Sequence, residues 1–208
     1  MIVVNIPANV MFMSPRNPEP TRSAVLAAAG TLLELGGPEA VTLRAVGEKV
    51  GVSRSAPYRH FPSKADLLAA LALRTLAELG DHIRAEGAED AVGSRLRGGC
   101  MGYVRWALAH PQHYLLVFGP APMADPPPAI EAAADDGLLA LQELVEAGQH
   151  DGHLADAPPR ELATAVWTFL HGLVHLQIGG HLHEPRTLDG HTRLTELVDL
   201  TLTSWRPR

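Results

Sequence analysis

The fold is determined by the stretch TLRAVGEKVGVSRSAPYRHFPSKADLL, residues 42–68. In its first part, apolar residues recur at the helical spacing i, i+3, i+7: Leu43, Val46 and Val50. This pattern predicts a short helix after Thr42, whose hydroxyl suits the N-cap. Gly51 stands where that helix must end, because glycine readily adopts the left-handed backbone that closes a helix. A second short helix is predicted over residues 54–60, and two short helices around a tight turn are the layout of a helix-turn-helix.

The outward side of the second short helix is small or polar, which suits an approach to the major groove of DNA, where Arg54 can read guanine through two hydrogen bonds. Tyr58 and Lys64 suit contacts with phosphates. Lys64 also follows Ser63, which opens a capping box and a long helix predicted to reach about residue 86. Pro57 would cost this short helix a backbone hydrogen bond if Ser53 were its N-cap, so we expect a tighter or later start.

Residues 22–71 resemble the DNA-binding domain of TetR-type transcriptional regulators, and the Tyr-x-His-Phe-x-x-Lys core of residues 58–64, with the Asp-Leu-Leu that follows, is specific to that family. The resemblance implies an all-helical homodimer with a small DNA-binding domain and a larger C-terminal domain that senses a ligand and dimerises. By the family pattern, Phe61 belongs to the core. The residues that approach DNA are then Thr42, Arg44, Arg54, Ser55, Tyr58, His60 and Lys64.

The whole chain is expected to be all-α, with about nine helices. A three-helix helix-turn-helix domain comes first, and a helical ligand-binding and dimerisation domain follows it. The expected boundaries are a flexible arm at 1–20, the DNA-binding domain at 21–66 and the C-terminal domain at 67–208. The first helix should end at Gly36-Gly37-Pro38. Further helices are predicted near 90–109, 111–118, 128–149, 159–180 and 191–205, and no window alternates with the period of a strand.

The chain of 208 residues has a formal net charge of −6, which by itself would argue against nucleic-acid binding. This total is an average over the chain, whereas phosphate binding depends on where the basic residues lie. Residues 1–75 hold eight Lys and Arg against five Asp and Glu, and residues 76–208 hold nine against eighteen. The two parts therefore suit two tasks. No apolar run is long enough to span a membrane and no convincing signal peptide is present, so a cytoplasmic protein is expected. The single cysteine excludes a disulfide scaffold and a zinc site built on several cysteines.

Aromatic residues and histidines mark a candidate effector pocket in the C-terminal part. The stretch from Trp167 to Leu173 resembles the Trp…His-Gly signature of one subgroup of the same regulators. A second aromatic concentration lies between Tyr103 and Phe118. The alternative is that these rings fill the core and the histidine bonds a carbonyl. The candidate ligand-binding residues are Trp106, His110, Tyr114, Phe118, Trp167 and His171.

The last two predicted helices carry apolar faces that we assign to a symmetric homodimer interface: Leu170, Leu173, Val174, Ile178, Leu194, Leu197, Val198 and Leu202. The alternative is that these faces pack within one protomer. His171 and His175 lie one helical turn apart, a spacing that can chelate a metal. No His-Glu-x-x-His occurs and acids nearby are few, so no metal or cofactor is expected, and a metal-sensing regulator stays as an alternative.

The sequence therefore predicts a homodimeric repressor that a small molecule of unknown identity releases from a pseudo-palindromic operator. The alternatives are an activator or a DNA-binding regulator without a ligand. An enzyme is not expected, because the chain carries no nucleophile elbow, phosphate-binding loop, dinucleotide fingerprint or metalloprotease motif.

Overall fold

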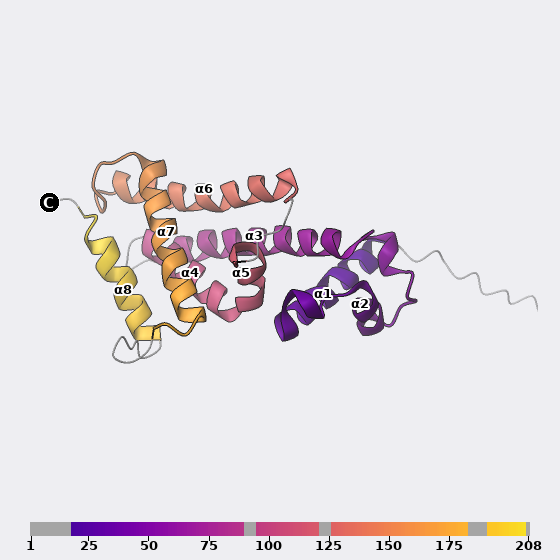
Figure 1. Cartoon of the computed structure of the whole chain (residues 1–208). Helices are drawn as coiled ribbons and strands as arrows, with labels where there is room; N and C mark the ends of the chain where they lie inside the picture. The colour runs from indigo at the N-terminus through magenta and orange to yellow at the C-terminus, as the bar shows by residue number, and fades with distance from the viewer. Residues whose placement is uncertain (1–17, 90–94, 121–125, 183–190, 207–208) are drawn as a thin grey trace, which may run out of the picture.

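The computed structural model describes residues 18–89, 95–120, 126–182 and 191–206, and within these ranges all regular structure is helical (Figure 1). The all-α class is thus confirmed. Residues 1–17 of the expected N-terminal arm lie outside the described ranges, and the first helix begins inside that arm. The elements are α1 (Pro18–Ala40), α2 (Leu43–Val50), the 3-10 turn η1 (Pro57–Arg59), α3 (Lys64–Glu89), α4 (Arg95–Ala109), α5 (Pro111–Phe118), α6 (Pro128–His150), α7 (Pro159–Ile178) and α8 (His191–Thr203). None of the described helices is long and apolar enough to cross a membrane.

The helix-turn-helix begins as its sequence predicts. The Thr42 hydroxyl accepts a hydrogen bond from the backbone N–H of Ala45 at 3.0 Å and so caps α2. Gly51 ends α2 with a left-handed backbone at φ 73°. Upstream, Gly36 and Gly37 interrupt α1, and the φ of 66° at Gly37 marks the end of the first helix where the sequence places it.

The short helix predicted over residues 54–60 is replaced by a tighter and later element, as the proline at position 57 led us to expect. Residues 54–56 form a turn, and only the short 3-10 turn η1 follows. Proline explains this, because Pro57 has no backbone N–H with which to continue an α-helical ladder. Its carbonyl instead accepts from the N–H groups of His60 and Phe61, both at 3.0 Å. Ser53 does not cap η1, whose N-cap residue is Ala56. The Ser53 hydroxyl lies 3.3 Å from that of Ser55.

Pro57 has a structural role of its own, because it is buried against α2. A Cβ placed on Gly47 of α2 would lie 3.3 Å from Cγ of Pro57. The glycine therefore leaves the room that the proline ring fills, and the two residues together fix the angle between α2 and η1.

The long helix α3 runs from the DNA-binding end through the middle of the molecule, with α6 along one side and α4 along another (Figure 1). Ser63 precedes α3 and caps its start. The Ser63 hydroxyl accepts a hydrogen bond from the N–H of Asp66 at 3.1 Å and donates one to the Asp66 carboxylate at 2.6 Å. The first half of α3 places Leu67 and Leu71 in an N-terminal core with α1 and α2. Its second half places Leu79 and Ile83 in a separate C-terminal core.

The apolar faces assigned to a dimer interface serve a different purpose in the structure. Leu170, Leu173 and Val174 of α7, with Leu194 and Val198 of α8, are buried in the C-terminal core of a single protomer. These five residues therefore pack within one protomer, as the alternative states, whereas Ile178, Leu197 and Leu202 are only partly buried. A different side of the same helices remains exposed.

Because α4 packs closely against α3, a methyl group added at this contact should lower stability, whereas one added at an open position should not. A Cβ on Gly102 would lie 2.6 Å from the backbone carbonyl oxygen of His82, whereas a Cβ on Gly137 of α6 would meet no atom within 4 Å. Gly102→Ala should therefore lower the free energy of unfolding by about 2 kcal/mol, because a helix backbone must shift. Gly137→Ala, the matched control, should raise it by about 0.5–1 kcal/mol. Urea unfolding measures both, and equal effects of the two substitutions would contradict the tight crossing.

Candidate nucleic-acid interface and small-molecule pocket

The side chains expected to approach DNA come from one stretch of the chain, which holds the start of α2, the turn before η1, η1 itself and the start of α3. Five are exposed: Thr42, Arg44, Arg54, Ser55 and Tyr58. His60 and Lys64 are half-buried. Phe61 is buried in the N-terminal core, as predicted, and the guanidinium of Arg22 lies 5.0 Å from the centre of its ring.

The basic residues of this surface differ in their partners. Arg44 is paired with Glu48 on the same helix, with 3.0 Å between Nε and Oε1. Lys64 lies 3.5 Å from a carboxylate oxygen of Glu39. Arg54 forms no ion pair with any residue that the structure describes. Of the three, Arg54 therefore offers the charge that a phosphate or a base edge can take without first breaking an ion pair.

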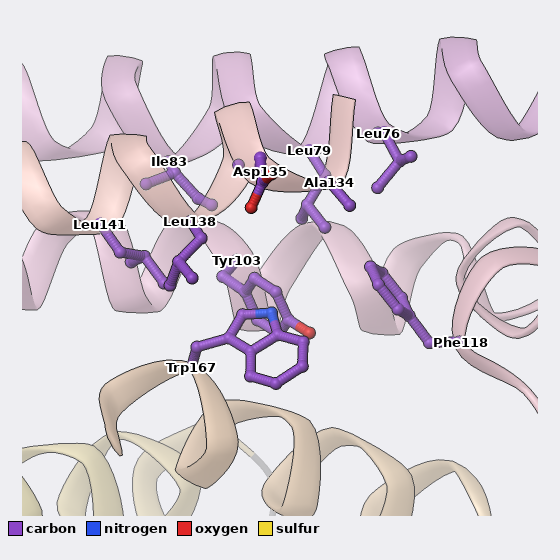
Figure 2. A pocket seen from close by; sticks show the side chains of 11 residues that line it. Leu76, Leu79, Ile83, Tyr103, Phe118, Ala134, Asp135, Leu138, Leu141 and Trp167 are labelled. Carbon is purple, nitrogen blue, oxygen red and sulfur yellow. The ribbon is translucent and has the colours of Figure 1, made fainter. Parts of the chain in front are cut away.

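A pocket of about 200 Å³ lies between α3, α4, α6, α7 and the end of α5 (Figure 2). Its walls are mostly apolar. Helix α3 contributes Leu76, Leu79 and Ile83, and α6 contributes Ala134, Leu138 and Leu141. Three aromatic rings close the remaining side: Tyr103, Phe118 and Trp167. Asp135 is the charged residue among the described lining, and Arg160 of α7 holds its carboxylate at 3.0 Å.

The structure brings four of the six candidate ligand-binding residues together at the aromatic end of this pocket. Phe118 and Trp167 line it. Tyr114 and His171 lie directly behind them, and the His171 ring centre is 4.3 Å from that of Trp167 and 4.5 Å from that of Phe118. Trp106 and His110 are not among the described lining residues, and they pack instead on each other with ring centres 5.1 Å apart.

Sequence reasoning missed the aliphatic half of the pocket. Leu76, Leu79 and Ile83 follow the spacing i, i+3, i+7, which also describes an ordinary core-facing stripe. Tyr103 belongs to the aromatic stretch between residues 103 and 118, but it is not one of the six candidate ligand-binding residues. Nothing in the sequence separates a side chain that lines a cavity from one that fills the core, because the difference depends on how five helices pack together.

A hydrogen-bonded network of two tyrosines and two histidines supports the aromatic end. The Tyr103 hydroxyl donates to the Tyr114 oxygen at 3.4 Å. That oxygen lies 2.7 Å from Nδ1 of His171 and 3.1 Å from Nδ1 of His175. Nε2 of His175 lies 3.0 Å from the backbone carbonyl oxygen of Phe118. Nε2 of His171 is buried and has no hydrogen-bond partner in the described structure.

Both ring nitrogens of His175 lie near backbone carbonyl oxygens, which only accept hydrogen bonds. Nε2 is 3.0 Å from the carbonyl oxygen of Phe118, and Nδ1 is 3.1 Å from that of His171. The Tyr114 hydroxyl lies between the two Nδ1 atoms and joins the two rings.

Burial disfavours the charged forms of His171, Tyr103 and Tyr114. Desolvation, with a smaller contribution from His175, lowers the pKa of His171 from its ordinary 6.5 to about 4. Burial raises the pKa of Tyr114 to about 12 and that of Tyr103 well above its ordinary value. His171 and His175 share the Tyr114 hydroxyl, and no cluster of three or more metal-ligating side chains occurs in the described ranges. His183 lies outside those ranges.

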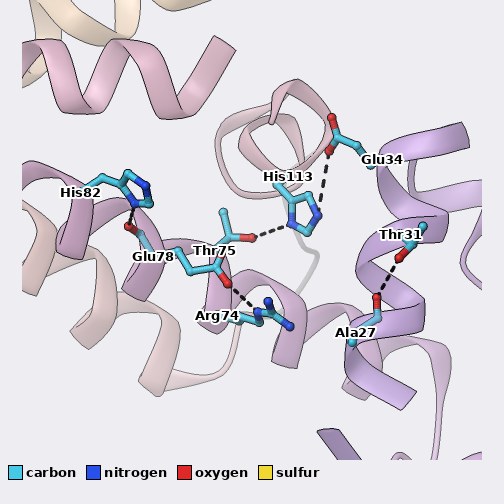
Figure 3. Close-up of polar contacts among 8 residues, drawn as sticks. All are labelled: Ala27, Thr31, Glu34, Arg74, Thr75, Glu78, His82 and His113. Atoms are coloured by element: carbon cyan, nitrogen blue, oxygen red, sulfur yellow. Dashed lines mark hydrogen bonds and ion pairs between the residues drawn. The ribbon is translucent and has the colours of Figure 1, made fainter. Parts of the chain in front are cut away.

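A second polar contact joins the DNA-binding end to the C-terminal part (Figure 3). His113 of α5 lies between α1 and α3, with Nδ1 3.1 Å from the hydroxyl of the fully buried Thr75. Its Nε2 lies 3.9 Å from a carboxylate oxygen of Glu34 on α1. Burial lowers the pKa of His113, although the nearby Glu34 opposes the shift. One imidazole therefore contacts both helices that carry the N-terminal core.

The lowered pKa of His171 predicts a pH dependence of stability. The folded chain binds this proton at about pH 4 and the unfolded chain at about 6.5, so the unfolded state binds more protons between these values. The stability that neutral His171 contributes is therefore complete above about pH 6.5 and is lost as the pH falls toward 4. The melting temperature of His171→Phe should fall less between pH 7 and pH 5 than that of the unsubstituted chain. Parallel curves in differential scanning calorimetry would contradict the assignment.

Comparisons with known proteins agree with this architecture. Residues 25–71 match the family described as bacterial regulatory proteins, tetR family, and residues 96–201 match the tetracyclin repressor-like C-terminal domain. The fold resembles that of a protein with unknown function from Rhodococcus sp. RHA1, at 24% identity and TM-score 0.77 over 95% of this chain and 100% of that one. It also resembles a TetR-family transcriptional regulator from Pectobacterium atrosepticum, at 21% identity and TM-score 0.70 over 94% and 98% of the two chains. A comparison with curated protein sequences found no match.

Proposed function

Since the chain belongs to the TetR family of bacterial regulatory proteins, we propose that it is a ligand-responsive repressor that a small molecule releases from its DNA operator. Regulators of this family are DNA-binding proteins rather than enzymes, and they act as dimers. The observation that carries the proposal is the position of α3, which lines the apolar pocket with Leu76, Leu79 and Ile83 and then continues into the N-terminal core.

DNA recognition is proposed for the exposed surface built by α2, η1 and the start of α3. Arg54 is the candidate for reading a base edge, because its side chain is exposed and is not held in an ion pair with a described residue. The hydroxyls of Thr42, Ser55 and Tyr58 suit phosphate oxygens. Arg44, His60 and Lys64 complete the proposed set, and Arg44 and Lys64 would exchange their present carboxylate partners for phosphates.

Two substitutions test the proposed DNA surface. Arg54→Ala should weaken binding to a selected operator duplex by about 1–3 kcal/mol, the value of one good base contact. Tyr58→Phe should weaken it by about 1 kcal/mol through the loss of a hydroxyl. Fluorescence anisotropy measures both, over a series of salt concentrations in which affinity should fall steeply.

The matched control for the DNA surface is Arg95→Ala, which removes an exposed arginine from α4. It should leave operator affinity close to that of the unsubstituted chain, and thermal melts should show all three variants folded. Unchanged affinity in both Arg54→Ala and Tyr58→Phe would remove these residues from the DNA surface.

Release from DNA is proposed to act through α3. A ligand that fills the pocket presses on the second half of this helix, and the first half carries Leu67 and Leu71 into the N-terminal core. The ligand shifts the equilibrium only by its differential affinity for the two positions of α3. A reporter gene behind the operator distinguishes this repressor from an activator, since deletion of the regulator raises expression only in the first case.

The proposed homodimer uses the exposed side of α7 and α8. Leu176 and Leu200 are large apolar residues there, with 46% and 69% of their surfaces exposed. Gly172, one turn before Leu176, has open space around its Cβ position, which suits the close approach of a second helix. These residues replace the buried leucines that the sequence pattern pointed to. Two copies of the α7–α8 pair would form a four-helix interface.

A charge on this side should separate the protomers. Leu176→Glu and Leu200→Glu should each shift the species seen in sedimentation velocity from twice the 22.2 kDa chain mass toward the chain mass itself. Leu35→Glu alters a leucine of α1 that is 77% exposed and serves as the matched control, with no expected shift. An unsubstituted chain that sediments at 22.2 kDa at micromolar concentration would overturn the dimer.

A further inference from the structure

We propose that the natural occupant of the pocket is a small, uncharged and mostly apolar molecule with a hydrogen-bond acceptor, such as a ketone or ester carbonyl, and that this oxygen accepts a hydrogen bond from the indole N–H of Trp167. The inference rests on the proposed role of the pocket as the effector site, and it adds the chemical class of the effector.

The walls of the pocket determine the apolar part of the occupant. Aliphatic side chains of α3 and α6 face the rings of Tyr103, Phe118 and Trp167 across about 200 Å³ (Figure 2). Such walls bind an aliphatic or aromatic body through burial of its apolar surface. The volume is smaller than that of the pockets that take drug-sized ligands, so a substituted single ring suits it.

The charges along the pocket favour an uncharged occupant. Among the described lining residues, the one ionisable carboxylate is that of Asp135, and it would repel an anionic head group. Arg160 lies 3.0 Å from this carboxylate and balances its charge, which weakens any attraction for a cation. The described lining includes no Lys, Arg or His side chain. A charged group that entered the pocket would therefore lose its hydration without gaining an unpaired partner of opposite charge.

The hydrogen-bond donors of the lining determine the polar part of the occupant. Two described lining side chains carry a donor of this kind, Tyr103 and Trp167. The Tyr103 hydroxyl already donates to the Tyr114 oxygen at 3.4 Å, whereas the indole N–H of Trp167 has no hydrogen-bond partner among the described residues. An indole nitrogen only donates, so the group that satisfies it must be an acceptor.

The orientation of the indole places this donor against an occupant. Its nitrogen edge is turned toward the lining side chains of α6 and α3 rather than toward α7, which carries it (Figure 2). The ring also packs on that of His171, with the two ring centres 4.3 Å apart. An apolar molecule in the pocket would separate the Trp167 N–H from water and leave it without an acceptor, which is costly. A ligand that brings an acceptor oxygen avoids this cost.

Two probes of nearly equal shape test the inference: 4-methylacetophenone and p-cymene, in which an isopropyl group replaces the acetyl group. Titrations of the full-length protein, followed by amide shifts in ¹H–¹⁵N spectra, give a dissociation constant for each probe. Trp167→Phe keeps an aromatic ring and removes the N–H, so it should weaken the ketone about fivefold relative to p-cymene. Trp205→Phe, the matched control, alters a tryptophan outside the described lining and should leave the ratio of the two constants unchanged. Thermal melts should show both variants folded.

A second measurement follows the hydrogen bond in the unsubstituted protein. The indole N–H signal of Trp167 is identified as the one that disappears in Trp167→Phe. On addition of 4-methylacetophenone, this proton should move downfield, and the carbonyl stretch of the bound ketone should fall to a lower frequency. A bound ketone whose carbonyl stretch equals its value in a hydrocarbon solvent would overturn the inference, because its oxygen would then accept no hydrogen bond.

The outcomes separate the inference from the proposed function. Equal weakening of both probes by Trp167→Phe would overturn the requirement for an acceptor and leave the pocket as a site for purely apolar molecules. Binding of neither probe, together with intact operator binding, would overturn the assignment of this ligand class. Ketone binding that depends on Trp167 but leaves operator affinity unchanged at saturation would support the ligand chemistry and contradict the proposed release mechanism.

Discussion

The rest of the structure depends on one constraint, which is that α3 serves two cores with a single unbroken helix. Leu67 and Leu71 complete the N-terminal core, whereas Leu79 and Ile83 belong to the C-terminal one. A sharp kink in an α-helix interrupts its backbone hydrogen bonds, so an unkinked α3 holds the two cores close to a fixed relation along its length. Gly102 lets α4 pack directly on the second half of α3 and secures that end. The pocket and the N-terminal core therefore share one helix, which is the physical link that the proposed release mechanism uses.

The sequence predicted local features well because their causes are local. The cap at Thr42, the left-handed Gly51 and the capping box at Ser63 each depend on residues within one turn of the chain. The capping box predicts the start of α3, and the TetR-type motif of residues 58–64 indicates the DNA-binding domain. An α-helix over residues 54–60 does not form, because Pro57 has no backbone N–H to donate. The sequence shows this conflict, but the geometry that results depends on the packing of Pro57 against Gly47.

Features that depend on distant helices were not predictable in the same way. Helices α7 and α8 carry apolar residues on more than one side, and the spacing alone does not say which side meets the core. Leu173 and Val198 are buried, whereas Leu176 and Leu200 are exposed. Likewise, the network around the Tyr114 hydroxyl forms only because His171 and His175 reach it from positions 57 and 61 residues further along the chain. In contrast, the division of charge between the basic residues 1–75 and the acidic residues 76–208 follows from the sequence alone.

The contact between Pro57 and Gly47 has a consequence for how this chain can vary over evolutionary time. The proline occupies space that exists only because residue 47 has no side chain, and the glycine is needed only while a bulky ring lies above it. A lineage that first enlarges residue 47 loses the place for the proline. A lineage that first replaces Pro57 frees residue 47 to vary. The two positions are therefore coupled, and the order in which they mutate decides which path stays open.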